Sequence, residues 1–498
     1  MAMETREFLR GKTILIVGAT GFLGKVFLEK ILREQPDVRC IFTLIRSKNV
    51  ESAQAKLQSQ VISKQLFGLL RERYKESYQE FMATKIVPVV GDVALNDLGI
   101  EESLRDELCA KVDIVVNSAA TTTFNERYDI SMKVNALGSK NVIDFCKRCC
   151  NLQLLCHIST AYVNVGSMGT VREEVVRTGE RVSYSGGEIS LSQIESECNL
   201  IKETIEEFKT VLGESWSYDK ESKYMKEFGA QRAMKFGWPN AYVFTKAVGE
   251  LMVDYFREDI PTVIIRPTII ESSLKEPFPG WIEGIRMMDP ILIGYGKGRL
   301  SFFLADPHLI LDVIPVDMVA NCMIASIARN SSQCGLHIYH VGSSHANPLK
   351  DTTSRDYWYN YFSAHPCTSE NGSIVRVKKL RYLESMADFK FYMTLYYLIP
   401  FQILYVVDKI LLGRFKLQPL YTFLLEKYRF AVKLAHIYEP FLFFKGRFNT
   451  SNTQDLWNKI SVRDQEIFNF DVKSIDWKHY FLECHIPGLL TYVIGGSK

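Results

Sequence analysis

Tyr242 and Lys246 lie four residues apart and are the pair in this chain best suited to proton transfer. On a helix this spacing puts both side chains on one face, one turn apart. A phenol with a reference pKa of about 10 is a poor proton donor near neutrality unless a neighbouring cation stabilises its anion. We therefore expect Lys246 to supply that charge, so that Tyr242 can donate a proton to a substrate oxygen.

The same spacing occurs in Tyr405 and Lys409, and the chain has 24 tyrosines, so spacing alone does not choose between the two pairs. Tyr405 lies in an apolar stretch, which favours a packing role. Tyr242 instead comes one helix before a predicted strand, in a region where strands and helices alternate. We therefore select Tyr242 and Lys246 as the catalytic pair.

Polar side chains near neighbouring strand ends complete the predicted site. Thr160 follows the fifth predicted strand, and the carboxyl ends of parallel strands meet at one edge of a sheet. We expect Thr160 to lie beside Tyr242 and Lys246, with Ser159 as the alternative hydroxyl. Asn135, on the helix after the fourth strand, is expected to complete a proton relay.

Three glycines at a spacing of three, Gly18, Gly21 and Gly24, follow a short apolar strand and open a helix. Such a turn lets the backbone approach a pyrophosphate, and the helix N-terminus adds free N–H donors and partial positive charge. A glycine triplet alone is weak evidence, but its place between the first strand and the first helix predicts a dinucleotide site. The residues predicted to bind there are Gly18, Thr20, Gly21, Phe22, Leu23 and Gly24.

The end of the second predicted strand distinguishes the two nicotinamide cofactors. An acidic residue there binds a free ribose hydroxyl, as in NADH, whereas an arginine accommodates the additional phosphate of NADPH. Arg46 follows this strand and no carboxylate occurs before Glu51, so we predict NADPH; the alternative is a solvated strand end. The other predicted cofactor contacts are Asp92, Val93, Asn117, Ala119, Lys246 and Pro267.

Short apolar segments alternate with helical stretches through much of the chain. Because the strands are apolar on both faces, we predict an α/β fold with a doubly wound parallel sheet of the Rossmann type. A polar insertion at about 171–235 is expected to form a lid or substrate cap. We place this reductase domain at 1–380 and a smaller, mainly helical domain at 381–498. The predicted strands are 13–17, 40–45, 86–90, 113–117, 152–158 and 262–266.

Charge and composition exclude other classes. A net charge of +3 is too small to indicate a nucleic-acid partner. One cysteine cluster lacks a second pair of ligands at suitable spacing. One histidine cluster lies on and just after a predicted strand, where it alternates with apolar residues, so we predict no metal site. A third cluster, of glycines, lacks a preceding strand and is predicted to be a mobile loop. The clusters are Cys146, Cys149 and Cys150; His337, His340 and His345; and Gly294, Gly296 and Gly298.

The segment Phe389–Val407 has about 19 residues with Lys390 as its charged side chain, which is just enough to span a bilayer as a helix. Pro400, Gln402 and many aromatic residues favour a membrane interface, with a buried core helix or acyl tunnel wall and a true span as alternatives. We expect no signal or transit peptide, because the first twelve residues are mixed in charge and lead directly into the first predicted strand. We expect a cytoplasmic protein or one on the cytosolic face of the endoplasmic reticulum, and not a plastid protein.

The glycine turn, Thr160, Tyr242 and Lys246 together resemble an extended short-chain dehydrogenase/reductase. Further strings resemble the plant branch of the alcohol-forming fatty acyl-CoA reductases almost from end to end. The C-terminal part is similar to the "male sterility protein" domain of that family. The strings are 124–129 (FNERYD), 237–240 (GWPN), 265–270 (IRPTII), 277–281 (PFPGW) and 339–344 (YHVGSS).

The resemblance implies a four-electron reduction of a long-chain fatty acyl-CoA to a primary alcohol. It implies that two NADPH are consumed, that the aldehyde is retained between the steps, and that Tyr242 and Thr160 bind the developing oxyanion. Two classes of alternative stay open. The first is another enzyme with the same Tyr-Lys chemistry: a two-electron acyl-CoA or carbonyl reductase, or a related sugar-nucleotide epimerase. The second is a non-catalytic NADPH-binding protein.

Overall fold

A seven-stranded parallel sheet forms the centre of the computed structural model, which describes residues 4–166, 168–176, 189–331, 333–369, 372–410 and 418–495. The strand order is β12-β7-β5-β4-β1-β2-β3, the order of a dinucleotide-binding fold. The six predicted strands are present, and β12 adds a seventh at one edge. The strands are β1 (Thr13–Val17), β2 (Cys40–Ile45), β3 (Ile86–Val90), β4 (Ile114–Asn117), β5 (Leu154–Ile158), β7 (Thr262–Pro267) and β12 (Leu336–Val341).

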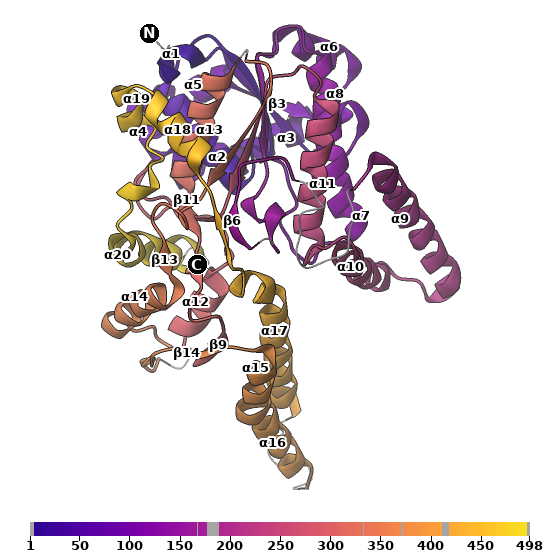
Figure 1. The fold of residues 1–498 in the computed structure, drawn as a ribbon, viewed down its shortest axis with the longest axis vertical. Helices are drawn as coiled ribbons and strands as arrows, with labels where there is room; N and C mark the ends of the chain where they lie inside the picture. Colours follow the sequence, from indigo (N-terminus) through magenta and orange to yellow (C-terminus); the bar gives the residue numbers. More distant parts are fainter. Residues whose placement is uncertain are drawn as a thin grey trace. The chain divides into compact units, whose positions relative to one another are not determined.

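Helices cover both faces of the sheet, which explains why its strands are apolar on both sides. Every residue of β1, β4, β5 and β7 is buried. On one face α2 (Phe22–Glu34) packs against α13 (Val316–Asn330), and on the other α8 (Gly138–Arg148) packs against α11 (Ala241–Phe256) (Figure 1). Shorter helices are α1 (Thr5–Leu9), α3 (Val50–Leu57), α4 (Gly68–Tyr74), α5 (Tyr78–Lys85), α6 (Glu102–Lys111) and α7 (Tyr128–Ser131).

The predicted insertion contains two helices, α9 (Leu191–Leu212) and α10 (Tyr218–Lys235). Ser190 begins α9 with a reciprocal capping box with Gln193. Arg232 on α10 forms an ion pair with Glu197 on α9, and the Tyr128 hydroxyl donates to the same carboxylate at 3.1 Å. The insertion is thereby tied to α7, and its role as a substrate cap stays a prediction; residues 177–188 of the insertion lie outside the described residues.

The chain divides into two compact units, and the division differs from the single boundary expected at residue 380. The sheet unit comprises Met1–Arg286, Asp312–Pro348 and Gly446–Lys498, and the helical unit comprises Met287–Leu311 and Leu349–Lys445. The C-terminal segment returns to the sheet unit because β15 (Gly446–Phe448) pairs with β6 (Gly169–Val171).

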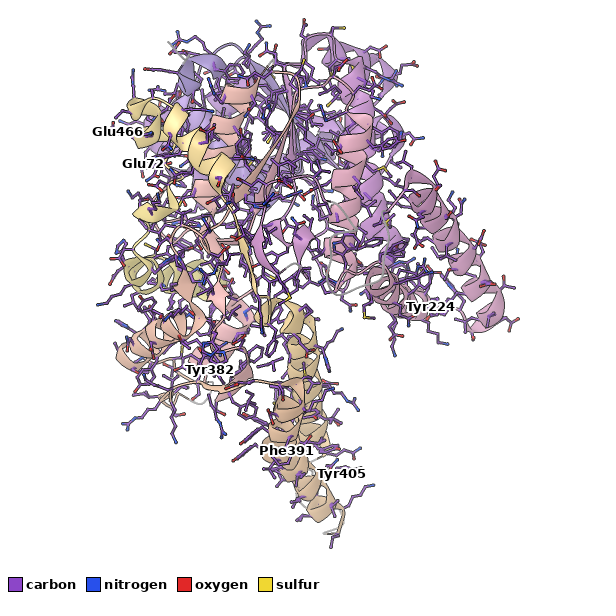
Figure 2. All side chains as sticks on the ribbon, in the orientation of Figure 1. Glu72, Tyr224, Tyr382, Phe391, Tyr405 and Glu466 are labelled. Carbon is purple, nitrogen blue, oxygen red and sulfur yellow. The ribbon has the colours of Figure 1, made fainter. Side chains whose placement is uncertain are left out.

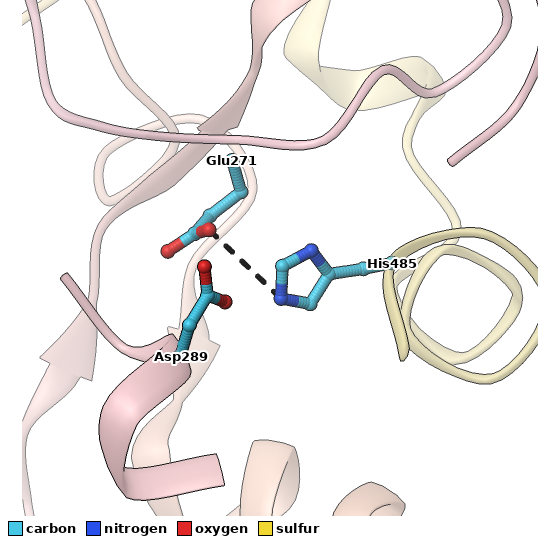
Figure 3. A group of neighbouring side chains, drawn as sticks. All are labelled: Glu271, Asp289 and His485. Atoms are coloured by element: carbon cyan, nitrogen blue, oxygen red, sulfur yellow. Dashed lines mark ion pairs between the residues drawn. The ribbon is translucent and has the colours of Figure 1, made fainter. Parts of the chain in front are cut away.

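Buried polar contacts also hold the C-terminal segment in the sheet unit. The Tyr480 hydroxyl donates to the Ser272 carbonyl at 2.8 Å. His485 lies 3.9 Å from Glu271, and both side chains are inaccessible to solvent (Figure 3). These contacts join residues more than 200 positions apart, which local sequence patterns do not reveal. The remaining C-terminal helices are α18 (Ser451–Lys459), α19 (Val462–Ile467), α20 (Trp477–His479) and α21 (Ile486–Gly488).

Within the helical unit, the predicted glycine loop is wrong. Gly294 and Gly296 belong to α12 (Asp289–Gly296), in which several apolar side chains are buried. A Cβ at Gly296 would lie 2.4 Å from the Phe362 ring on α14 (Asp351–Ala364). The absence of a side chain at Gly296 therefore lets α12 and α14 pack closely, and the glycine does not serve a mobile loop.

The apolar C-terminal segment lies in a continuous helical stretch, Met386–Ile410, which is the one such helix among the described residues that is long and apolar enough to cross a membrane. Only 11% of its most apolar window is buried. Figure 2 marks Phe391 and Tyr405 on this stretch. It comprises α15 (Met386–Met393), a π-helical turn η9 (Thr394–Leu398) and α16 (Ile399–Ile410), and it packs along α17 (Gln418–Leu442).

Candidate active site

The glycine turn is shaped by contacts that exclude side chains. Gly18 has a φ of +96°, and a Cβ there would lie 2.6 Å from the backbone nitrogen of Ala119. A Cβ at Gly24 would lie 2.4 Å from the Gly18 carbonyl oxygen. Both positions therefore require glycine. Because Val17 pairs with Asn117, the turn lies directly beside the end of β4.

The first turn of α2 fits a pyrophosphate. Gly21 is the N-cap and offers no side chain to bind the first N–H groups of the helix. Those donors and the helix dipole are available to an anion, while Gly18 and Gly24 keep its approach clear. The predicted residues Thr20, Phe22 and Leu23 lie in this turn, with Phe22 as the first residue of α2.

The other predicted cofactor residues follow neighbouring strands at the same edge of the sheet. Arg46 is exposed just past β2, and Asp92 and Val93 follow β3. The Asp92 carboxylate accepts from the Ala94 N–H at 2.9 Å. Asn117 is buried at the end of β4, where its amide lies 3.3 Å from His157. The strand order thus brings residues from β1 to β4 to one crevice.

The helix α11 carries the predicted catalytic pair. Asn240 caps it by accepting the Val243 N–H at 2.9 Å. One turn later, the Lys246 ammonium donates to the Ile158 carbonyl at the end of β5, at 2.6 Å. Burial lowers the pKa of Lys246 to about 8, and the nearby carboxylate of Glu250 acts in the opposite direction. Lys246 is thus fixed beside the strand end that leads to Thr160.

Tyr242 is half-buried, and its ring lies 5.5 Å from that of Phe124. Its low exposure to water raises the pKa of the phenol to about 12. Burial dominates the pKa of the resting phenol, and in this state the Lys246 ammonium donates to the Ile158 carbonyl. The phenol is therefore protonated at neutral pH, as a hydrogen-bond donor to a substrate oxygen must be.

Two hydroxyls follow β5, and they differ in their partners. Thr160 accepts the Tyr162 N–H at 3.3 Å and donates to the Pro267 carbonyl at 3.5 Å. The buried Ser159 hydroxyl has no hydrogen-bond partner within the residues that the structure describes. Thr160 stays the predicted oxyanion donor, with Ser159 as the adjacent alternative.

Asn135 lies in a π-helical turn, η5 (Met132–Leu137), that α11 crosses closely. Its side chain accepts the Thr121 N–H at 3.0 Å, and it donates to the Thr121 carbonyl at 3.2 Å and to the Thr245 hydroxyl at 3.0 Å. A Cβ at Gly249 would lie 2.3 Å from the Asn135 carbonyl oxygen. Asn135 therefore positions α11 and the loop after β4; its role in a proton relay stays a prediction.

A buried ion pair that sequence reasoning missed fixes the other end of α11. The Arg266 guanidinium on β7 donates to both oxygens of Glu250, at 2.6 to 3.1 Å, and both side chains are fully buried. His340 on β12 lies 3.3 Å from the same guanidinium, and burial lowers its pKa to about 3. The available signal was an arginine inside an apolar strand and a glutamate one turn after Lys246.

The second Tyr-Lys pair has a packing role, as predicted. On α16 the Lys409 ammonium lies 5.0 Å from the centre of the Tyr405 ring, and that ring stacks on Tyr421 at 4.4 Å.

The sheet order, the glycine turn and the Tyr-Lys pair define a nicotinamide-dependent reductase of the short-chain dehydrogenase/reductase type. Family models described as male sterility protein match residues 16–323 and 396–495. Fatty acyl-CoA reductase 1 of Arabidopsis thaliana is 43% identical over 98% of both chains, and the alcohol-forming fatty acyl-CoA reductase of Simmondsia chinensis is 39% identical over the same shares. The chain belongs to the fatty acyl-CoA reductase family.

Solved structures show the same fold at low identity. The terminal reductase domain from the myxalamid PKS-NRPS pathway has a TM-score of 0.58 and 17% identity, over 97% of this chain and 92% of that chain. The reductase domain of a non-ribosomal peptide synthetase from Mycobacterium tuberculosis has a TM-score of 0.55 and 16% identity, over 99% and 93%. These likenesses concern the fold alone.

Replacing Tyr242 by Phe removes the proposed proton donor but keeps the ring that packs near Phe124. We expect kcat to fall about a hundredfold to a thousandfold, with cofactor binding retained, because one oxyanion donor contributes on the order of 3 kcal/mol. The control is Tyr255→Phe on the same helix, whose side chain is exposed, and its activity should match the wild type. Full activity in Tyr242→Phe would refute the assignment.

Activity should decrease as the pH rises through about 8, where Lys246 loses its proton. Below that pH the ammonium is charged and holds its hydrogen bonds; above it the charge is lost, whereas the phenol stays protonated because its pKa is about 12. The measurement is kcat/KM from about pH 6 to 11. A flat profile across this range, or a decrease only near the ordinary lysine pKa of about 10.4, would contradict this prediction.

Proposed function

We propose that the protein reduces long-chain fatty acyl-CoA to a primary fatty alcohol, with NADPH as reductant and the aldehyde retained between two reductions. The observation that carries this proposal is the catalytic pair on α11, in a chain related over 98% of its length to a protein named alcohol-forming. The nicotinamide supplies hydride when it is bound, and the residues of the chain supply the proton and the electrostatic stabilisation.

Each polar residue of the site has a distinct part in this chemistry. Tyr242 donates a hydrogen bond to the thioester carbonyl oxygen, where negative charge develops, and the hydroxyl of Thr160 is the second donor. Expulsion of the thiolate leaves an aldehyde in the same place. In the second reduction Tyr242 gives its proton to the aldehyde oxygen, and Lys246 stabilises the phenolate that results.

The proposed preference for NADPH rests on Arg46. It is exposed at the carboxyl end of β2, where a dinucleotide places its adenine ribose. A guanidinium there pairs with a phosphate on that ribose and offers no acceptor to a free hydroxyl.

Product analysis with palmitoyl-CoA tests the proposed function. We expect hexadecanol as the main product and two NADPH oxidised for each alcohol formed. Aldehyde as the sole product would show a two-electron reductase. If the thioester causes no oxidation of NADPH, the proposal is overturned.

Arg46→Ala should reduce the preference for NADPH over NADH by about tenfold or more, since it removes one charge-assisted pair.

We further propose that the helical unit contacts the cytosolic face of the endoplasmic reticulum membrane, from which a long acyl chain can be drawn. The support is the exposed apolar surface of Met386–Ile410. Ile403, Val407 and Ile410 lie one turn apart on α16 and are 57%, 42% and 72% exposed. Their exposure favours an interfacial contact over a buried core helix.

Replacing Ile403, Val407 and Ile410 together by Gln should lower binding to phosphatidylcholine vesicles at least tenfold, because each apolar side chain contributes about 1 kcal/mol or more on burial in lipid. The measurement is flotation with vesicles. The control replaces Val211 and Val462, which are exposed in the sheet unit, and should bind as the wild type does. Equal binding by the triple variant would contradict the membrane contact.

A further inference from the structure

The segment 272–286, which we call the strap, follows β8 (Ile269–Glu271) and closes on itself. The Ser273 N–H donates to the Trp281 carbonyl at 3.0 Å, and the Gly280 N–H donates to the Ser273 carbonyl at 2.9 Å. The Ser273 hydroxyl also accepts the Trp281 N–H at 2.9 Å. The strap contains the PFPGW string noted in the sequence, which the proposed chemistry does not use.

A buried carboxylate anchors the strap. Asp317, in the first turn of α13, accepts the N–H groups of Leu274, Lys275 and Glu276 at 2.9 to 3.0 Å. Glu276 also forms an ion pair with Lys30 on α2. These bonds are internal to the sheet unit, so the position of the strap is established by the protein itself.

The far end of the strap lies over the first turn of α2. The Trp281 ring stacks on Phe22 with centroids 5.2 Å apart. The Arg286 guanidinium lies 4.1 Å from the centre of the same Phe22 ring. Glu283 forms an ion pair with Lys25, one turn further along α2. Since Phe22 is the first residue of α2, its backbone N–H is among the donors that face a pyrophosphate.

Positive side chains gather at this end of α2. The charged side chains with the largest effects on the pKa of Lys25 are Glu283, Lys64 and Arg286. Burial lowers the pKa of Lys25, and the two other cations act in the same direction while Glu283 opposes them. Lys25, Lys64 and Arg286 thus lie around one carboxylate, and this local positive charge favours an anion at the first turn of α2.

The geometry suits arginine in particular. A guanidinium can stack its face on an aromatic ring and still direct its N–H edge to phosphate oxygens. One Arg286 N–H already donates to the Glu283 carbonyl, which limits the rotation of the group. A lysine at this position would present a point charge without the planar face.

We infer that Arg286 is a direct ligand of the cofactor pyrophosphate and that the strap holds it over the first turn of α2. The inference rests on nicotinamide dinucleotide binding by this site, but not on the choice between the two cofactors, because NADH and NADPH have the same pyrophosphate. The strap is thus an additional element of the cofactor site, supplied by a segment more than 250 residues beyond the glycine turn.

Titration calorimetry with Arg286→Gln tests this inference on cofactor binding alone. We expect Kd to rise about tenfold to a hundredfold for NADPH and for NADH, the range of one charge-assisted hydrogen-bonded pair. Adenosine 2′-monophosphate carries neither phosphate of the pyrophosphate, and its affinity should fall less than threefold. Arg46→Ala should weaken the binding of this monophosphate and of NADPH but leave that of NADH nearly unchanged, so failure of the proposed NADPH preference is distinguished from failure of this inference.

Two further variants separate contact from net charge and from misfolding. Lys64→Gln removes a partly exposed cation 3.6 Å from the same Glu283, and we expect less than a threefold change in Kd. Arg286→Lys keeps the charge and should bind NADPH with intermediate affinity and an unchanged melting temperature without ligand. Wild-type affinity in Arg286→Gln, an equal loss of affinity for adenosine 2′-monophosphate, or an equal loss of affinity in Lys64→Gln would each overturn the inference.

Discussion

The close crossing of α11 over the π-helical turn η5 is the constraint on which the site depends. At Gly249 the helix approaches the Asn135 carbonyl so closely that no Cβ fits. The Asn135 side chain then bonds both the loop after β4 and Thr245 on α11. Since Tyr242 and Lys246 are on that helix, this crossing determines where the phenol and the ammonium lie relative to the sheet edge.

Buried charges maintain the arrangement in a region from which water is largely excluded. An isolated buried ion is costly, so Glu250 and Arg266 are tolerated because they satisfy each other with several hydrogen bonds. Lys246 has the Ile158 carbonyl as a hydrogen-bond partner. Its pKa is still lowered, because burial disfavours the charged ammonium. The phenol of Tyr242 avoids that cost by staying neutral until it transfers its proton.

Local patterns predicted much of this molecule. The strands, the glycine turn and α11 depend on apolar runs, on a glycine spacing and on a helical spacing, each visible within about twenty residues. Contacts across long sequence distances were not predictable in this way: β15 beside β6, Arg266 beside Glu250, and the strap over α2.

The boundary expected at residue 380 differs from the two units for the same reason, because the chain leaves the sheet unit and returns to it. The mobile loop expected around Gly294 is a helix, since its glycines serve packing and not flexibility.

The most direct test of the central claim is the isotope content of the product formed from acyl-CoA and NADPH that carries deuterium at the transferred position. If one site performs both reductions on a retained aldehyde, each alcohol molecule will contain two deuterons on its first carbon, even when unlabelled aldehyde is present in the solution. Two results would contradict the account: singly deuterated aldehyde that accumulates in solution, or alcohol with a single deuterium, which forms when unlabelled aldehyde from the solution is reduced.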